Sequence, residues 1–202
     1  MPALTRSRLR ELPVERAARE LLGVEVHTEI DGFRAAGRIV ETEAYRGADD
    51  KAAHSYGYKR TRRTEVFFGD AGHAYVYLIY GLHRMFNVVV GPPEEPNAVL
   101  VRALEPLDGT DAMLARRQLT SAGGRLANGP ALVCQALGIT RAHYGVDLLA
   151  AGAPIRLVGD LGTVAPERIT ASPRVGVAYA GECAAWPWRF RESGNPYTSP
   201  AK

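Results

Sequence analysis

The chain has 202 residues, a net charge of +3 and 46% hydrophobic residues, which is enough to bury the core of one domain. Its two cysteines, Cys134 and Cys183, lack a Cys-x-x-Cys spacing, and its five histidines form no His-x-x-x-His pair. These counts disfavour a disulfide scaffold, a zinc ribbon and an iron–sulfur cluster, and we expect no metal and no cofactor.

The chain has no apolar stretch long enough to span a bilayer, and its first residues lack the apolar core of a signal peptide. We therefore expect a cytoplasmic protein. Lysine occurs only at positions 51, 59 and 202, so arginine supplies nearly all the positive charge. Arginine is well suited to gripping phosphate, although a GC-rich coding sequence also produces an arginine-rich protein.

The first part of the chain predicts a helix followed by a β-hairpin. A helix is expected over residues 13–21, with proline at its first position and Gly23 after its end. The pair Asp31-Gly32 is a two-residue turn signal between a strand at 24–29 and a longer strand at 33–45.

The end of the longer strand places two acids on one face. Because side chains alternate along a strand, one face is expected to carry Ile39, Glu41, Glu43 and Tyr45. The opposite face is expected to carry Arg38, Val40, Thr42 and Ala44. An acidic strand face is ordinarily a solvated one, so the neighbouring residues must decide between that interpretation and a catalytic one.

Residues 46–73 are polar and rich in glycine, and they predict a long loop, which in a compact domain is usually functional or disordered. The run Lys59–Arg63 concentrates positive charge in this loop. Three of its residues are candidate contacts to the phosphates of a polyanion, although a solvated charged loop is an equally good interpretation. These candidates are Arg60, Arg62 and Arg63.

A second hairpin is predicted from strands at 74–80 and 85–90, with Tyr80 at its tip. Asn87 is the only polar residue of the second of these strands, and Arg102 is isolated in the apolar run 98–104. A buried polar group without a partner costs on the order of 1–3 kcal/mol, so both residues must have partners in the structure or in a ligand.

The second half of the chain predicts helices at 110–119 and 130–137 and short late strands. The late strands are expected at 154–158, 173–177 and 186–190. Together these elements indicate an α+β fold with a mainly antiparallel sheet, and residues 1–202 are expected to form a single domain.

Three stretches of this sequence resemble the alkyladenine (3-methyladenine) DNA glycosylase family, in its bacterial form. They are GRIVETEAYRGADDKAAH at 37–54, YVYLIYG at 75–81 and LVRALEP at 100–106. The resemblance continues through shorter matches at 129–130, 134–137, 174–177 and 180–182, in family order. It implies a curved antiparallel sheet with surrounding helices and a protruding hairpin, related to the C-terminal domain of methionyl-tRNA formyltransferases.

The resemblance also implies an activity. Such an enzyme flips an alkylated or deaminated purine out of duplex DNA and hydrolyses its N-glycosidic bond. By family position, Glu43 is the general base and Arg102 lies beside the attacking water, where its charge holds the Glu43 carboxylate. Tyr80 matches the wedge that fills the gap in the DNA stack. The partner would be damaged double-stranded DNA, bound by a monomer associated with the nucleoid.

The base pocket follows from the same resemblance. Tyr45, His54 and Tyr77 match the residues that stack on and contact the flipped base. Asn87 matches the residue that excludes the exocyclic amine of guanine. Glu41 has no family role and is expected to be structural.

Lyase chemistry is not expected, because it needs an amine that forms a Schiff base with the sugar. Only Lys51 and Lys59 are near the predicted site. Pro2 could expose a proline amine, but the acid that follows such a proline in formamidopyrimidine-type glycosylases is replaced by Ala3.

The chain departs from the family pattern at Thr64, Phe67 and Leu132, which could alter DNA contacts or substrate range. Two other functions stay open. A non-catalytic nucleic-acid-binding module would not need the Glu43 carboxylate beside an anionic ligand. A hydrolase of free nucleosides would be expected to carry an aspartate cluster for a metal-bound ribose, which the sequence lacks.

Overall fold

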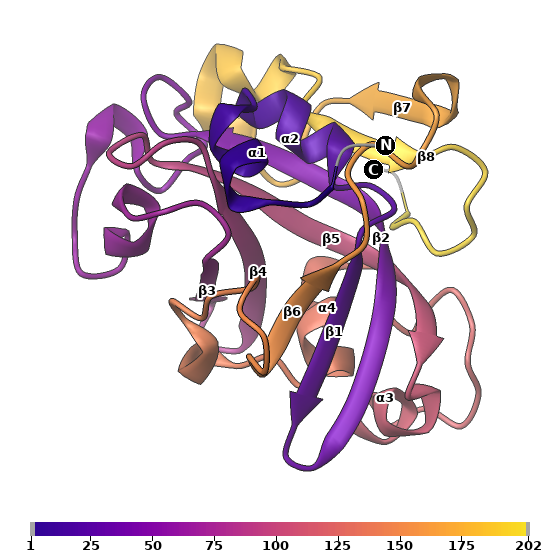
Figure 1. Cartoon of the computed structure of the whole chain (residues 1–202). Helices are drawn as coiled ribbons and strands as arrows, with labels where there is room; N and C mark the ends of the chain where they lie inside the picture. Colours follow the sequence, from indigo (N-terminus) through magenta and orange to yellow (C-terminus); the bar gives the residue numbers. More distant parts are fainter. Residues whose placement is uncertain (1–2, 201–202) are drawn as a thin grey trace.

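The computed structural model describes residues 3–200 (Figure 1). Its strands are β1 (Glu25–Ile30), β2 (Phe33–Arg46), β3 (Ala74–Ile79), β4 (His83–Val90), β5 (Asn97–Asp108), β6 (Ile155–Val158), β7 (Ile169–Ser172) and β8 (Arg189–Glu192). Its helices are α1 (Arg6–Glu11), α2 (Val14–Glu20), α3 (Thr110–Arg117) and α4 (Pro130–Leu137). Short 3-10 helices are η1 (Tyr56–Tyr58), η2 (Glu65–Phe68), η3 (Arg141–His143), η4 (Pro166–Arg168) and η5 (Ala178–Ala185).

The strands form one open sheet in the order β3-β4-β5-β2-β1-β6, with β8 added against β2 and β7 against β8. Each pairing between strands of the described residues is antiparallel. The predicted α+β class with a mainly antiparallel sheet is therefore confirmed. The long strands β2 and β5 run side by side through the middle of the molecule (Figure 1).

Two register shifts bend the β2–β5 pair where the acids lie. The pairing passes from Ile39–Leu104 to Glu41–Ala103 and then to Thr42–Val101. Val40 on β2 and Arg102 on β5 are thus the extra residues of two β-bulges, which turn neighbouring side chains to new directions.

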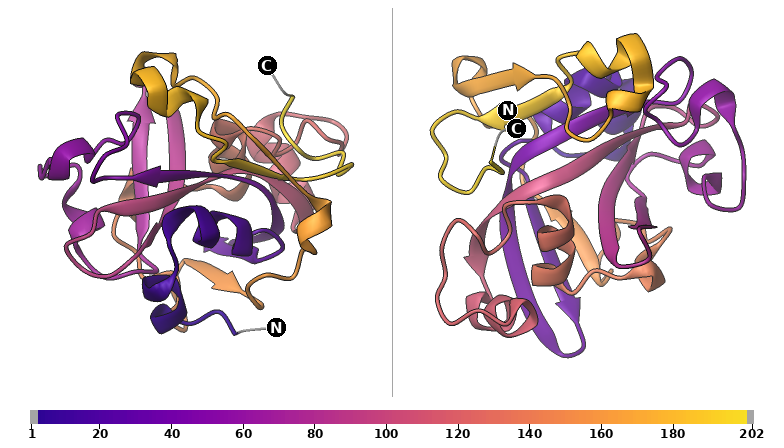
Figure 2. Two further views of the ribbon diagram at one scale, coloured as in Figure 1. Left: turned by 90° about the horizontal axis from the view of Figure 1, so that it is seen from above. Right: turned by 180° about the vertical axis from the view of Figure 1, so that it is seen from behind.

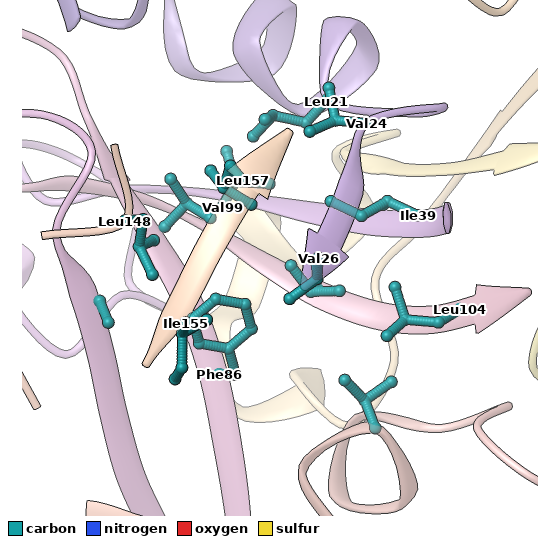
Figure 3. Packing of buried hydrophobic residues seen from close by; sticks show 14 of the residues in the cluster. Leu21, Val24, Val26, Ile39, Phe86, Val99, Leu104, Leu148, Ile155 and Leu157 are labelled. Atoms are coloured by element: carbon teal, nitrogen blue, oxygen red, sulfur yellow. The ribbon is translucent and has the colours of Figure 1, made fainter. Parts of the chain in front are cut away.

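The prediction that Ile39 shares a face with Glu41 and Glu43 is wrong, because of the bulge at Val40. The Ile39 side chain packs in the main hydrophobic core near Val26 and Leu104 (Figure 3). It does not share a face with Glu41 and Glu43, because the extra residue at Val40 reverses the alternation between them. Beyond the bulge the alternation holds: Ala44 lies on the face opposite Glu43, as predicted, and this face packs in the core.

The first hairpin has the predicted turn, since Asp31 and Gly32 both have positive φ angles, of 54° and 75°. The second hairpin is tighter than predicted, because β4 already begins at His83. Its tip is made of Tyr80, Gly81 and Leu82.

The helices bury apolar residues in the main hydrophobic core, and three of the four lie close to predicted helices. Helix α2 begins at Val14 and not at Pro13, which precedes it in an extended conformation with a ψ angle of 145°. Helix α1 was not predicted; the Thr5 side chain caps it by accepting a hydrogen bond from the Arg8 amide. Helices α3 and α4 match the predicted helices at 110–119 and 130–137, and α3 ends at Arg117.

The late strands are only partly as predicted. Strand β6 is confirmed, and β8 begins at Arg189, after the two tryptophan residues of the expected strand. The strand expected at 173–177 is wrong. This segment is a loop, and the chain around it lies beside the 46–73 segment (Figure 2). Val177 and Ala52 belong to the same small hydrophobic cluster.

Within residues 3–200, no helix is long and apolar enough to cross a membrane.

Candidate active site

A cavity of about 390 Å³ opens beside the β3–β4 hairpin. Six of the seven side chains predicted to act in catalysis, base binding or wedging line this cavity. They are Tyr45, His54, Tyr77, Tyr80, Asn87 and Arg102. Residues separated by more than fifty positions in the sequence therefore lie around one space.

Sheet register explains why these side chains meet. Tyr75 of β3 pairs with Asn87 of β4, which pairs with Leu100 of β5, which pairs with Glu43 of β2. Side chains of directly opposed residues lie on the same face of a sheet. One row of side chains across β3, β4, β5 and β2 therefore runs from Tyr75, in the wall of the cavity, to the candidate base Glu43.

Glu43 lies behind the cavity and is fully buried. Its Oε1 accepts a hydrogen bond from the Val175 amide at 2.8 Å. Its Oε2 accepts one from the Tyr45 hydroxyl at 2.7 Å and lies 3.2 Å from Nη1 of Arg102. Since these three partners all line the cavity, Glu43 is separated from it by a single layer of polar groups.

Two neighbours of Glu43 have shifted pKa values. Burial, reinforced by the Glu43 carboxylate, raises the pKa of the Tyr45 hydroxyl well above its usual value. Burial by itself would lower the pKa of Arg102, but Glu43 and Glu41 outweigh it and raise that pKa. Tyr45 is therefore a protonated donor and Arg102 a permanent cation at neutral pH.

An aromatic wall forms one side of the cavity. The Tyr75 and Tyr77 rings stack with 5.1 Å between centroids, and the His54 ring meets Tyr77 edge-on at 4.6 Å. Phe67, at a position that departs from the family pattern, also lines the cavity. Its ring centroid lies 4.2 Å from that of Tyr75. This wall can stack on a flat ring, most strongly on an electron-poor or cationic one.

His54 is held in its neutral form by its surroundings. Burial and the nearby Arg63 charge lower the pKa of His54 from 6.5 to about 4. Arg63 Nη2 lies 3.1 Å from His54 Nε2 and 3.3 Å from His54 Nδ1, and Nδ1 also lies 2.8 Å from the Tyr75 hydroxyl. A neutral ring suits this place, because arginine can only donate and needs an unprotonated ring nitrogen as its acceptor.

The depressed pKa of His54 predicts a pH-dependent loss of stability. Between pH 6.5 and about 4 the unfolded chain binds a proton that the folded chain does not, so stability falls as pH falls through this window. Urea unfolding at about pH 7 and about pH 4.5 should show a smaller loss for His54→Gln than for the wild type. The control His83→Gln removes an exposed histidine and should behave as the wild type. Equal losses for all three proteins would contradict the assignment.

Asn87 lies on the cavity floor and is almost completely buried. Its Nδ2 donates to the Tyr75 carbonyl at 3.1 Å, which fixes the orientation of its amide. The partner that this isolated polar residue required is therefore a backbone group of the neighbouring strand.

Tyr80 stands at the tip of the second hairpin with 91% of its surface exposed. Its φ angle is 51°, a left-handed conformation that is uncommon for a residue other than glycine and costs on the order of 1 kcal/mol. The adjacent Leu82 is 75% exposed. An exposed ring on a strained backbone at the mouth of a cavity is a candidate for contact with a ligand.

The three candidate phosphate contacts have different environments. Arg60 forms ion pairs with Glu65 and Glu94. Arg63 lies over the Tyr77 ring, 5.1 Å from its centroid. Arg62 is exposed, has no ion pair within residues 3–200, and lines a second hollow of about 830 Å³ next to β3. Of the three arginines, Arg62 is therefore the one most available to contact a phosphate.

Sequence reasoning missed the part played by the 173–177 segment. Arg174 is fully buried and bridges Asp50 Oδ1 at 2.8 Å and the Ala44 carbonyl at 2.8 Å. Its guanidinium also lies over the Tyr45 ring. The only signal in the sequence is the family motif at 174–177, which lies in the segment predicted as a strand. The segment instead presents the Val175 amide to Glu43.

Among residues 3–200, no three His, Cys, Asp or Glu side chains are grouped so that they could hold a metal ion.

Comparison with known proteins agrees with these features. The family model described as Methylpurine-DNA glycosylase (MPG) matches residues 8–196. A Bacillus cereus (strain ATCC 10987 / NRS 248) protein named "Putative 3-methyladenine DNA glycosylase" is 47% identical over 188 residues, which are 90% of this chain and 92% of that protein. Proteins of the same name from Bacillus cereus (strain B4264) and Bacillus anthracis (strain CDC 684 / NRRL 3495) are 48% and 47% identical with the same coverage. The chain therefore belongs to the methylpurine-DNA glycosylase family.

Proposed function

We propose that this DNA glycosylase flips alkylated or deaminated purines out of duplex DNA and hydrolyses their N-glycosidic bond with water activated by Glu43. The substrates are 3-methyladenine, 7-methylguanine, hypoxanthine and 1,N6-ethenoadenine. The observation that carries the proposal is a buried carboxylate, paired with Arg102, directly behind a cavity with an aromatic wall.

In the proposed reaction the flipped base stacks between Tyr45, His54 and Tyr77, which all line the cavity. A water takes over the hydrogen bond that the Tyr45 hydroxyl makes to Glu43 Oε2. As the water oxygen attacks C1′ of the sugar, Glu43 takes its proton, and the purine leaves with the electron pair of the broken bond. The negative charge of Glu43 also stabilises the positive charge that develops on the sugar.

The surface around the cavity supports binding to duplex DNA. Tyr80 acts as the wedge, since an exposed ring at a hairpin tip can enter the stack from the minor groove. Arg60, Arg62 and Arg63 contact phosphates, although Arg60 must first leave its acidic partners.

The alternative is a non-catalytic nucleic-acid-binding module of the formyltransferase C-terminal type. The buried pair of Glu43 and Arg102 argues against it, because a binding module gains nothing from a carboxylate beside its anionic ligand. A hydrolase of free nucleosides is disfavoured by Tyr80, since a free nucleoside offers no stack for a wedge to enter.

Duplex DNA that carries each lesion in turn tests the proposal. Wild-type protein is expected to release the base and leave an abasic site that breaks only after alkali treatment. Absence of excision from every substrate would overturn the glycosylase activity. Strand cleavage without alkali, or a covalent adduct trapped with borohydride, would overturn the proposed lack of lyase activity.

The wedge role of Tyr80 gives a separate prediction. In Tyr80→Asn the flipped base should be captured about tenfold less well, since stacking on an aromatic ring is worth roughly 1–3 kcal/mol. Thermal stability should not fall, because asparagine tolerates the left-handed conformation at this tip. The salt dependence of DNA binding should change little, as no phosphate contact is lost.

Binding to a lesion duplex over a range of salt concentrations measures these effects. The control is Phe33→Ser, which removes an exposed ring at the other hairpin and should leave DNA binding unchanged. A large change in the salt slope of Tyr80→Asn would contradict the wedge role.

A further inference from the structure

Glu41, the second acid of the strand, is bound by four hydrogen-bond donors. Its Oε1 accepts from Arg102 Nε at 3.0 Å, Arg189 Nε at 2.7 Å and the Ser199 hydroxyl at 2.7 Å. Its Oε2 accepts from the Ser199 amide at 2.6 Å. Glu41 is fully buried, so these four donors replace its hydration.

The hydrogen bond that Arg102 donates to Glu41 orients the guanidinium toward Glu43. The guanidinium is planar and its donors are rigidly spaced, so holding Nε fixes the plane and the direction of the terminal nitrogens. In this orientation Nη1 of Arg102 lies 3.2 Å from Glu43 Oε2. Within residues 3–200, the polar contacts of the Arg102 side chain are those with Glu41 and Glu43. Its orientation therefore depends on Glu41.

The charges of this buried network balance. Glu41 and Glu43 contribute two negative charges, and Arg102 and Arg189 contribute two positive charges. Because Arg102 contacts both acids, its positive charge is shared between Glu41 and Glu43.

Ser199 brings the end of the chain into this network. It lies outside the matched residues 8–196, yet it is only 6% exposed and supplies two of the four donors to Glu41. Nη2 of Arg189 also donates to its hydroxyl at 3.1 Å. The C-terminal segment returns to β2 and β8 (Figure 1). There Ser199 binds Glu41 of β2 and Arg189 of β8.

We infer that Glu41 and Ser199 are positioning residues that hold Arg102 in the orientation required beside Glu43, so that the C-terminal segment is a working part of the active site. The inference rests on the proposed glycosylase function. Neither residue touches the substrate: both act on the rate of bond cleavage through Arg102.

Three serine variants test the inference. Ser199→Ala removes the hydroxyl donor and is expected to lower the single-turnover excision rate about fivefold, as expected for one hydrogen bond of about 1 kcal/mol. Ser199→Thr keeps a hydroxyl and should retain most of the rate. Ser193→Ala is the matched control, because the Ser193 hydroxyl in the same segment contacts only Thr170 at the surface.

Glu41→Gln is the stronger test. The amide cannot accept from all four donors, so excision should fall at least tenfold, while affinity for a duplex that carries an abasic-site analogue stays within about twofold of the wild type. A purely structural role would instead lower the melting temperature without changing the excision rate of the folded protein. If Glu41→Gln does not fold, the serine variants decide.

The outcomes separate this inference from the proposed function. A wild type without excision activity overturns the proposed function. An active wild type whose rate is matched by Ser199→Ala overturns the positioning role alone.

Discussion

Glu43→Gln is expected to lower single-turnover excision by on the order of 10²–10⁴-fold, the usual contribution of a general base. Glutamine has nearly the same shape as glutamate but cannot accept a proton from water. Its carbonyl can still accept the hydrogen bond that the Val175 amide donates to Oε1. The loss should therefore appear in the rate of bond cleavage, and lesion DNA should still bind.

Excision is measured with enzyme in excess over a hypoxanthine duplex, next to binding of the same duplex. Glu29→Gln serves as the control, because Glu29 is an exposed acid of β1 whose one ion pair within residues 3–200 is with Arg34 at the surface. It should leave the rate unchanged. Excision by Glu43→Gln at the wild-type rate would overturn the role of Glu43 as the base.

Arg174→Met is expected to lower the free energy of unfolding by about 3–5 kcal/mol, the usual cost of removing one partner of a buried ion pair. The Arg174 and Asp50 side chains are both fully buried. Without the guanidinium, the Asp50 carboxylate and the carbonyls of Ala44 and Cys183 lose a donor in a place that water does not reach.

Urea unfolding measures this loss. Replacing both partners, in Arg174→Met with Asp50→Leu, should recover part of it, since no buried charge is then left unpaired. The control Arg34→Met removes an exposed arginine and should change stability by less than about 1 kcal/mol. If Arg174→Met and Arg34→Met lower the free energy of unfolding by a similar amount, the buried pair does not stabilise the fold as predicted.

Strand alternation predicted the acidic face of β2 only in part. Glu41 and Glu43 do lie on one side, where both contact Arg102. Ile39 lies on the other side because of the bulge at Val40. Such a bulge depends on pairing with β5, and one strand considered by itself carries no sign of it.

The bulge at Arg102 shows the same limit from the other strand. Leu104 and Val101 both pack in the main core, so simple alternation from Leu104 would also direct Arg102 into that core. The extra residue in β5 directs it to the acids instead. The sequence identified Arg102 as an isolated cation in an apolar strand, but its partners came from the pairing of β5 with β2.

The sequence by itself determined most of the elements that carry the site, and it determined the candidate residues. Turn residues and alternating apolar residues located the two hairpins, and the resemblance of the motifs singled out Glu43, Tyr45, His54 and Arg102. These signals are local, because the physical rules behind them act over a few neighbouring residues.

Only the tertiary structure decided how those residues are held. The Val175 amide that binds Glu43 is 132 positions away from it, and Ser199 is 158 positions from Glu41. Contacts over such separations leave no periodic pattern in the sequence, since they depend on which backbone and side-chain groups the fold brings together. A buried carboxylate must find its donors wherever the fold places them, and here they come from a loop and from the C-terminal segment.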